Sequence, residues 1–370
     1  MSKDASKRVM SGEVWSDFCR ALEAAGEVVL REGSPRDVFD RAEGFRYLSR
    51  LTRTALETFL EFADPVAPVL FRPAHETVKI GADNPDNYYQ KAAISGRERY
   101  RIFGGRGTVH YLGFGTYTGD YGSEGRRGQT GYLEASDLEI DAEGRFEILL
   151  SSEAPESGNW LPMEPETSSL IVRQTFENRD SEQVADLKIE HLGQNRQPPP
   201  LTADQLDRGL SSAAAFVAGT AELFCNWSEG FAQRPNALPP FDSAVAGAAH
   251  GDPHIRYYHG YFEVAPDEVL VIDLDPPSCD YWNFQLNNHW MESLDWRQNR
   301  IDLNHRTAAL EGDGSVRIVV AHRDPGHANW LDPSHHVRGT MCLRWIRADR
   351  HPTPKTRLLS FQEWDAIRNG

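Results

Sequence analysis

The sequence predicts a mainly β protein with helices, an α+β chain of two tandem repeats. Each repeat is expected to be a helix followed by an antiparallel, jelly-roll-like β-sandwich. Three observations predict this: residue identities that recur at an offset of 170 positions, a helical pattern at the same offset, and short alternating runs bounded by turn residues. With 370 residues, 39% of them hydrophobic, the chain can bury more than one sizeable core.

The repeat is clearest between residues 142–161 and 312–331. Six positions are identical at the offset of 170: Gly144 and Gly314, Ile148 and Ile318, Pro155 and Pro325, Asn159 and Asn329, Trp160 and Trp330, Leu161 and Leu331. The same offset aligns residues 111–114 with 281–284, both of which begin with Tyr and end with Phe. A fixed offset across helix, strand and turn signals indicates duplication. The alternative is that β proteins in general share similar turn and strand sequences, which would produce part of this similarity.

Each copy is expected to open with a helix. In the first copy, Ser34 and Pro35 are typical of a helix start, with Ser34 as the capping hydroxyl, and apolar residues follow at helical spacing as far as Phe62. The second helix is expected over 205–232, after a Pro-rich linker at 197–200.

These boundaries predict three parts. A helical extension covers 1–31, the first helix and sandwich cover 32–200, and the second helix and sandwich, which carry the expected site, cover 201–370. Two copies of similar length are expected to pack against each other.

The acidic composition argues against nucleic acids and membrane surfaces as binding partners. Asp and Glu outnumber Lys and Arg by 55 to 39, for a net charge of −16, and such a surface repels nucleic-acid phosphates and anionic lipids. The N-terminus has no secretory pattern, no apolar run is long enough to cross a membrane, and the four cysteines form no paired motif. We therefore expect a cytoplasmic protein with a small-molecule partner, and a homodimer is compatible with the sequence.

The segment 322–336 carries four of the 13 histidines. His322 and Asp324 stand where the first copy has Ser152 and Ala154, and Asp332 and His335 stand where it has Pro162 and Pro165. Residues needed only for folding should recur in both copies, so residues confined to one copy are candidates for chemistry. Histidine with carboxylate favours acid–base catalysis; metal ligation and a merely polar loop are the other interpretations.

The segment 280–292 is predicted to be a strand with two different faces. Trp282, Phe284, Leu286 and Trp290 are expected in the core, whereas Tyr281, Asn283, Gln285, Asn287 and His289 share the other face. A row of amides, a phenol and an imidazole suits a ligand that carries hydroxyl or carbonyl groups. A solvent-facing strand is the alternative.

Several of these motifs together resemble domain-of-unknown-function family twelve-fourteen. They are the run 281–286, the turn 324–326, the step 329–332 and the ending His336-x-x-Gly339 before Arg344. The resemblance is specific over about 255–347 and implies a bacterial protein with a β-sandwich or jelly-roll fold, but no shared activity. In the family pattern a Gly precedes the histidine that matches His336, whereas this chain has His335 there.

Two functions remain open at this point. The first is an acid–base enzyme, of lyase, isomerase or hydrolase type, acting on a hydrophobic oxygenated molecule such as a steroid, terpenoid or aromatic catabolite. Its pocket is expected between 280–292 and 322–336. The residues expected to transfer protons are His322, Asp324, His336, His335 and His289. The residues expected to contact the substrate are Tyr281, Trp282, Gln285, Asn287, Trp290, Asn329, Trp330, Asp332 and Arg344.

The second function is a β-sandwich module that binds a glycan or a lipid. It predicts a shallow groove with exposed aromatic side chains rather than an enclosed pocket. No cofactor is required by the sequence, and a divalent metal ion is compatible with the histidines and carboxylates.

Overall fold

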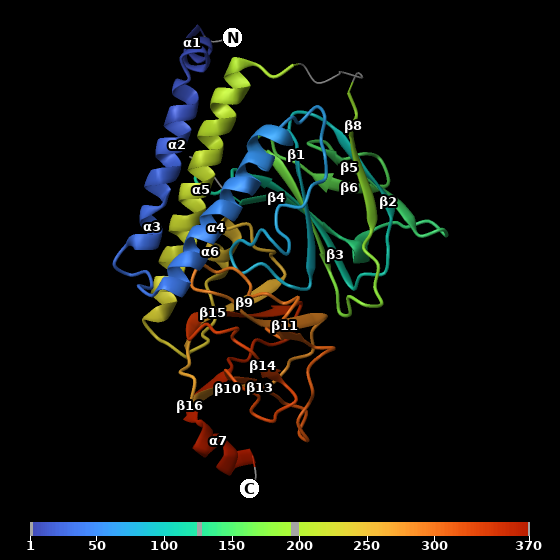
Figure 1. Ribbon diagram of the computed structural model, residues 1–370. Coiled ribbons are helices and arrows are strands. Elements are labelled where there is room, and N and C mark those ends of the chain that lie inside the picture. Colours follow the sequence, from blue (N-terminus) through green and yellow to red (C-terminus); the bar gives the residue numbers. More distant parts are fainter. Residues whose placement is uncertain (1–2, 124–127, 194–199, 369–370) are drawn as a thin grey trace.

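The computed structural model describes residues 3–123, 128–193 and 200–368 of the chain. A layer of helices lies beside two β-sandwiches, which follow one another along the molecule (Figure 1). Module one contains strands β1 to β8, and module two contains strands β9 to β16. The predicted mainly β chain with helices and two repeated halves is confirmed.

The helical layer is formed largely by the N-terminal region and by the long helix between the modules. Its members are α1 (Lys3–Ser11), α2 (Glu13–Ala25), α3 (Glu27–Leu30), α4 (Val38–Leu56), a π-helical turn (Glu57–Glu61) and α5 (Ala203–Ala232). Buried apolar side chains from α2, α3, α4 and α5 form one helical core. No helix in the described ranges is long and apolar enough to cross a bilayer.

The two long helices begin at side-chain caps. Helix α5 starts with a capping box between Thr202 and Gln205. Helix α4 is capped by Asp37, whose carboxylate accepts the Asp40 N–H at 2.9 Å. The prediction that Ser34 is the cap was wrong. Residues before proline are disfavoured in helical geometry, and the Ser34 hydroxyl instead donates to the Val28 carbonyl at 2.8 Å.

Each sheet of module one has four strands. The inner sheet has the order β1-β7-β3-β4, and the outer sheet has the order β6-β5-β2-β8. The strands are β1 (Asn87–Ala93), β2 (Tyr100–Gly105), β3 (Tyr111–Thr118), β4 (Gly128–Glu134), β5 (Arg145–Ser151), β6 (Asn159–Pro162), β7 (Ser169–Thr175) and β8 (Asp186–His191), with a 3-10 turn at Ala135–Asp137. Their apolar faces enclose the core of this module.

Module two repeats this order strand for strand. Its inner sheet is β9-β15-β11-β12 and its outer sheet is β14-β13-β10-β16. The strands are β9 (Ile255–Glu263), β10 (Glu268–Leu274), β11 (Tyr281–Leu286), β12 (Asp302–Asn304), β13 (Val316–Val320), β14 (Trp330–Leu331), β15 (Arg338–Ile346) and β16 (Lys355–Ser360). Helix α6 (Ser243–Ala248) precedes β9, and α7 (Phe361–Arg368) ends the described chain.

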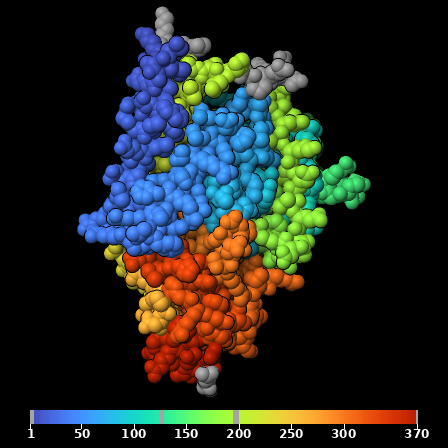
Figure 2. Space-filling model, in the orientation of Figure 1, coloured from blue at the N-terminus to red at the C-terminus, as the bar shows by residue number. Residues whose placement is uncertain are grey.

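The strand registers confirm the duplication. Ile102 lies opposite Ile148 in module one, and Ile272 lies opposite Ile318 in module two. The only parallel pairing in either described module joins β5 to β6 and β13 to β14, again at equivalent residues. Figure 2 shows the two modules packed in contact, with module two (orange to red) below module one and the helices.

Strand β11 is only partly as predicted. Trp282, Phe284 and Leu286 enter the core of module two, as the alternation indicates. Trp290 does not, because the strand ends at Leu286 and the chain turns. The Trp290 ring packs in the helical core, and its indole N–H donates to the Asp40 carbonyl at 2.9 Å. The predicted linker at 197–200 lies, except for Pro200, outside the described residues.

Candidate ligand-binding site

A cavity with a mainly apolar lining lies where the inner sheets of both modules meet helix α5. It holds about 1190 Å³ of empty space, part of it open to solvent. Its wall is rich in aromatic and aliphatic side chains. They include Tyr121, Phe216, Phe224, Trp227, Phe241, Ile171, Ile255 and Ile346. A large apolar cavity with a few convergent polar groups is the usual form of a small-molecule site.

Two arginines at equivalent positions line this cavity. Arg173 on β7 lies between Tyr89 on β1 and Gly113 on β3. Arg344 on β15 lies between Tyr257 on β9 and Asn283 on β11, which are the same positions of the repeat. The polar sides of the two inner sheets thus each present one guanidinium to the same space.

Each arginine binds a loop of the opposite module. Arg344 donates to the Ala82 carbonyl, just before β1, and Arg173 donates to the His250 carbonyl, just before β9, at 2.6 Å. Ala82 and His250 have positive φ angles of 57° and 60°, so the two loops share the same unusual backbone turn. The modules are therefore joined by two equivalent and reciprocal contacts.

The remaining partners of the two guanidiniums differ. Arg344 also donates to Gln285 at 2.6 Å and to Asn283 at 3.3 Å. Arg173 donates to the Tyr117 hydroxyl at 2.8 Å. Arg344 is 5% exposed, so its charge is almost fully removed from water.

Lys91 on β1 and His259 on β9 also occupy equivalent positions of the repeat, and both line the cavity. Lys91 forms an ion pair with Asp120. His259 is surrounded by aromatic rings, stacking on Phe231 with ring centroids 5.5 Å apart, and burial lowers its pKa to about 3. A neutral imidazole therefore faces the cavity at neutral pH.

A solved structure with high similarity covers almost the whole chain. An uncharacterised protein from Burkholderia cenocepacia has 50% sequence identity and a TM-score of 0.94, over 96% of this chain and 99% of that one. The sequence model of the family described as protein of unknown function (DUF1214) matches residues 121–175 and 266–349, one stretch in each module. The chain belongs to the DUF1214 family.

Other comparisons add little to the DUF1214 assignment. The VPA0106 protein from Vibrio parahaemolyticus is 11% identical, with a TM-score of 0.48 over 86% of this chain and 98% of that one. No curated protein matches the sequence. Both cavity arginines of this DUF1214 protein lie inside the matched stretches.

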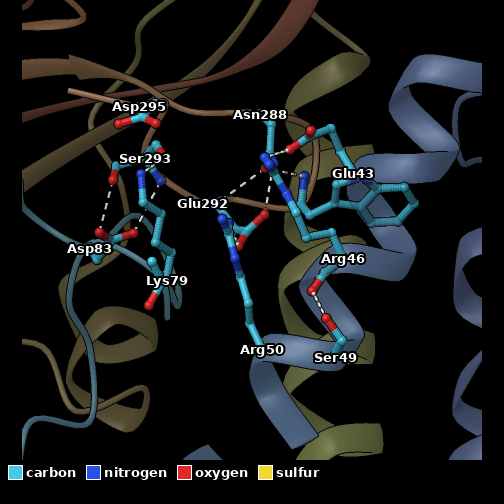
Figure 3. Close-up of polar contacts among 12 residues, drawn as sticks. Glu43, Arg46, Ser49, Arg50, Lys79, Asp83, Asn288, Glu292, Ser293 and Asp295 are labelled. Carbon is cyan, nitrogen blue, oxygen red and sulfur yellow. Dashed lines mark hydrogen bonds and ion pairs between the residues drawn. The ribbon is translucent and has the colours of Figure 1, made fainter. Parts of the chain in front are cut away.

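A second polar cluster supports the loop that receives Arg344. Asp83, next to Ala82, accepts hydrogen bonds from the backbone and the hydroxyl of Ser293 at 3.0 and 2.8 Å, and Lys79 donates to the Ser293 and Leu294 carbonyls (Figure 3). Burial raises the pKa of Asp83 and lowers that of Lys79. These groups satisfy one another, so we interpret the cluster as the structural support of one cavity edge.

Glu292 extends this cluster towards helix α4. Its carboxylate accepts hydrogen bonds from the Arg50 guanidinium at 2.6 Å and from the Asn288 amide at 2.9 Å (Figure 3). Burial raises the pKa of Glu292, although Arg50 opposes that shift. The ion pair ties the turn after β11 to the helical layer.

The amides predicted to bind a ligand are buried inside the protein. Gln285 donates to the Asp83 carbonyl at 2.9 Å, and Asn287 donates to the Thr340 hydroxyl at 3.2 Å. Tyr281 donates to Asp86. The face is not solvent-exposed, but its polar groups bind other parts of the protein.

The candidates of the histidine-rich segment do not meet in one place. His322 bonds to the Val264 carbonyl at 2.9 Å, exposed Asp324 accepts the Gly326 N–H at 2.7 Å, and Asp332 accepts the Ser334 N–H at 2.8 Å. His335 is exposed. Buried His336 lies beside the Asp40 carboxylate on α4, with Nδ1 and Oδ1 3.5 Å apart. Their catalytic roles stay predictions.

The two segments do share a pocket, since Asn288 and Glu292 line it together with Ser334 and His336, beside helix α4. The other candidate residues of 280–292 and 322–336 do not line it. His289 faces the helical layer, with Nδ1 2.8 Å from the Tyr261 hydroxyl, and burial lowers its pKa to about 3. Trp330 packs beside Phe361 and Trp364. Asn329 closes its own sheet through the Ala309 and Arg317 carbonyls.

Sequence reasoning found Arg344 but missed Arg173, Tyr89, Tyr257 and His259. The repeat could have identified them, since Arg173 and Arg344 follow equivalent apolar runs, but insertions shift the offset from 170 to 171 there. In the described residues, no group of three or more His, Cys, Asp or Glu could hold a metal ion.

Proposed function

We propose that this protein binds a hydrophobic, oxygenated small molecule in the cavity between its two modules. One observation carries the proposal. The cavity is walled by aromatic and aliphatic side chains, and a small set of buried polar groups converges on it. Apolar walls provide affinity by removing ligand surface from water, and the few polar groups orient the ligand.

The location supports a ligand role over a purely structural one. Apolar side chains that line unfilled space forgo the packing that normally stabilises a core. The walls come from β1, β7, β9, β15 and α5, so the cavity exists only when both modules are assembled.

A shallow groove for glycans has less support. That function predicted exposed aromatic side chains, whereas Trp282 and Trp290 are 3% and 1% exposed. Trp227 lines the interior cavity instead of an open surface.

Acid–base turnover of the bound molecule stays a prediction. Of the groups lining the cavity, Lys91 with Asp120, Tyr111 and His259 can exchange protons with a ligand. The histidine-rich segment does not line it, so a catalytic reaction would depend on these other groups.

Filling the cavity tests the proposal. Wild-type protein should bind members of a panel of fatty acids, aromatic acids, terpenoids and steroids in calorimetry. Ile171→Trp, which places an indole in the cavity, should abolish that binding. Phe103→Trp introduces the same side chain on the outer sheet of module one and should leave binding unchanged. Equal binding by Ile171→Trp and wild type would show that the ligand sits elsewhere.

A further inference from the structure

We infer that the ligand of this cavity is an organic anion whose carboxylate faces Arg173 and Arg344 while its apolar body packs on the aromatic wall. This inference rests on the proposed function and names its substrate class. It draws on the charge of the cavity, the hydrogen bonds of the two guanidiniums, and a buried imidazole nitrogen.

The cavity carries the opposite charge to the protein. The whole chain has a net charge of −16. The side chains that line the cavity include Lys91, Arg173 and Arg344 but only two carboxylates, Asp83 and Asp120. The lining therefore has an excess of one cationic side chain inside an acidic protein, which favours an anionic ligand at that place.

Carboxylates of the protein do not neutralise the two arginines directly. Asp120 pairs with Lys91, and the Asp83 carboxylate accepts from Ser293. Within the described ranges, neither guanidinium forms an ion pair. Asp252 acts on Arg173, and Asp83 and Asp86 act on Arg344, only at longer range. Burial of an uncompensated guanidinium costs several kcal/mol, about the cost of one buried ion.

Both guanidiniums keep donors for a ligand. A guanidinium has five N–H groups. The hydrogen bonds described here use three of them on Arg344 and two on Arg173. Binding a loop carbonyl requires a hydrogen-bond donor but no positive charge. The positive charge of each guanidinium is therefore available to an anionic ligand. Planar carboxylates match the geometry of a guanidinium best.

His259 adds an independent sign of a missing partner. Its side chain is 5% exposed and lines the cavity, yet Nδ1 has no hydrogen-bond partner among the described residues. Buried polar atoms are normally satisfied, and an exception in a cavity indicates a bound group. A neutral imidazole can donate one hydrogen bond to a carboxylate oxygen.

The test compares acids with alcohols of the same shape. Octanoate and octanol form one pair, cinnamate and cinnamyl alcohol the other, with affinities measured by calorimetry on the full chain at neutral pH. Wild-type protein should bind each acid at least about tenfold more tightly than its alcohol, since a charge-assisted hydrogen bond is worth about that factor. Arg173→Gln should weaken the acids about tenfold and the alcohols less than about twofold.

Arg101→Gln is the matched control. It removes a guanidinium from the outer sheet of module one, where Arg101 pairs with Glu147, and should change neither affinity. The wild-type comparison needs no variant, so it decides even if Arg173→Gln fails to fold.

Three results would overturn the inference. Equal affinity for acid and alcohol in wild type refutes it but leaves the proposed function standing, as does an equal loss of both in Arg173→Gln. Absence of binding by these four probes and by the whole wider panel refutes the proposed function, and the inference falls with it; binding of neutral panel members alone refutes only the inference.

Discussion

The equivalent strands β3 and β11 show how two copies of one module divided their tasks. On the face towards the other module, β3 has Gly113 and Gly115 where β11 has Asn283 and Gln285. A Cβ on Gly115 would lie 2.6 Å from the Tyr117 ring, so these glycines make room for tyrosine rings. The amides of β11 fill the same space with hydrogen bonds to Arg344.

In each module, side chains of the inner sheet bind the loop that precedes the first strand of the other module. Asn283 donates to Asn84 at 2.9 Å, in the loop before β1. In the other direction, Tyr111 and Tyr132 donate to Asp252, in the loop before β9, at 3.1 and 2.7 Å. The two copies have kept the same backbone geometry, but their side chains differ. These side-chain differences affect the contact between the modules as well as the cavity.

The largest expected effect separates the two arginines. Arg344→Leu leaves three buried acceptors without their donor, and should lower the free energy of unfolding by about 3 kcal/mol or more. Arg173→Leu removes two contacts and should cost about 2 kcal/mol. Urea denaturation measures both, with Arg101→Leu as a control within about 0.5 kcal/mol of wild type. Equal losses would mean that the amides of β11 add nothing.

The helices that precede the two sandwiches should respond oppositely to alanine. A Cβ on Gly44 in α4 would lie 2.6 Å from the Trp290 ring, so Gly44→Ala should destabilise the protein by about 1–3 kcal/mol through overpacking. Gly230 in α5 has open space, and Gly230→Ala should stabilise it by about 0.5–1 kcal/mol through helix propensity. Thermal denaturation should show a lower melting temperature for Gly44→Ala and a higher one for Gly230→Ala. A higher melting temperature for both variants would contradict the packing of Trp290 against Gly44.

The paired asparagines at β6 and β14 should differ only through burial. Asn159 and Asn329 each bridge equivalent backbone groups of their own sheet, but Asn329 is 0% exposed and Asn159 is partly exposed. Asn329→Ala should cost about 2 kcal/mol and Asn159→Ala about 1 kcal/mol. If chemical denaturation shows no loss in Asn159→Ala, the repeat no longer depends on this contact in module one.

His259 should make stability depend on pH. Its folded pKa of about 3 lies below the ordinary histidine pKa of 6.5, so between those values the unfolded chain binds a proton that the folded chain does not. Stability should therefore fall as pH falls through this window, by at most about 1.4 kcal/mol per pH unit from this residue. His259→Phe should flatten the slope measured by urea denaturation at a series of pH values; an unchanged slope would mean that His259 is protonated in the fold.

The repeat made part of the structure predictable. The identical residues at an offset of 170 occupy equivalent positions in both modules, and the Trp160 and Trp330 indoles donate to the equivalent carbonyls of Ser151 and Ala321. Alternation placed Trp282 correctly in a core. These features depend on neighbours within one module, so a single copy contains the information.

The candidate site was much less predictable. Comparison of the copies singled out residues 322–336 because their side chains differ, but most of those polar groups bond to nearby backbone. No pattern in the sequence indicated the cavity residue Arg173, since it belongs to the copy that lacks the histidine-rich segment. Difference between copies proved a weaker guide than a shared charged residue.

The amino-acid sequence by itself determined the helix-plus-sandwich module and the fact of its duplication, because periodic burial and turn residues act over short distances. The tertiary structure alone decided that both modules turn one arginine towards a common cavity beneath α5. That arrangement arises from reciprocal contacts between residues more than 75 positions apart, such as Arg173 with His250 and Arg344 with Ala82, and no local pattern encodes them.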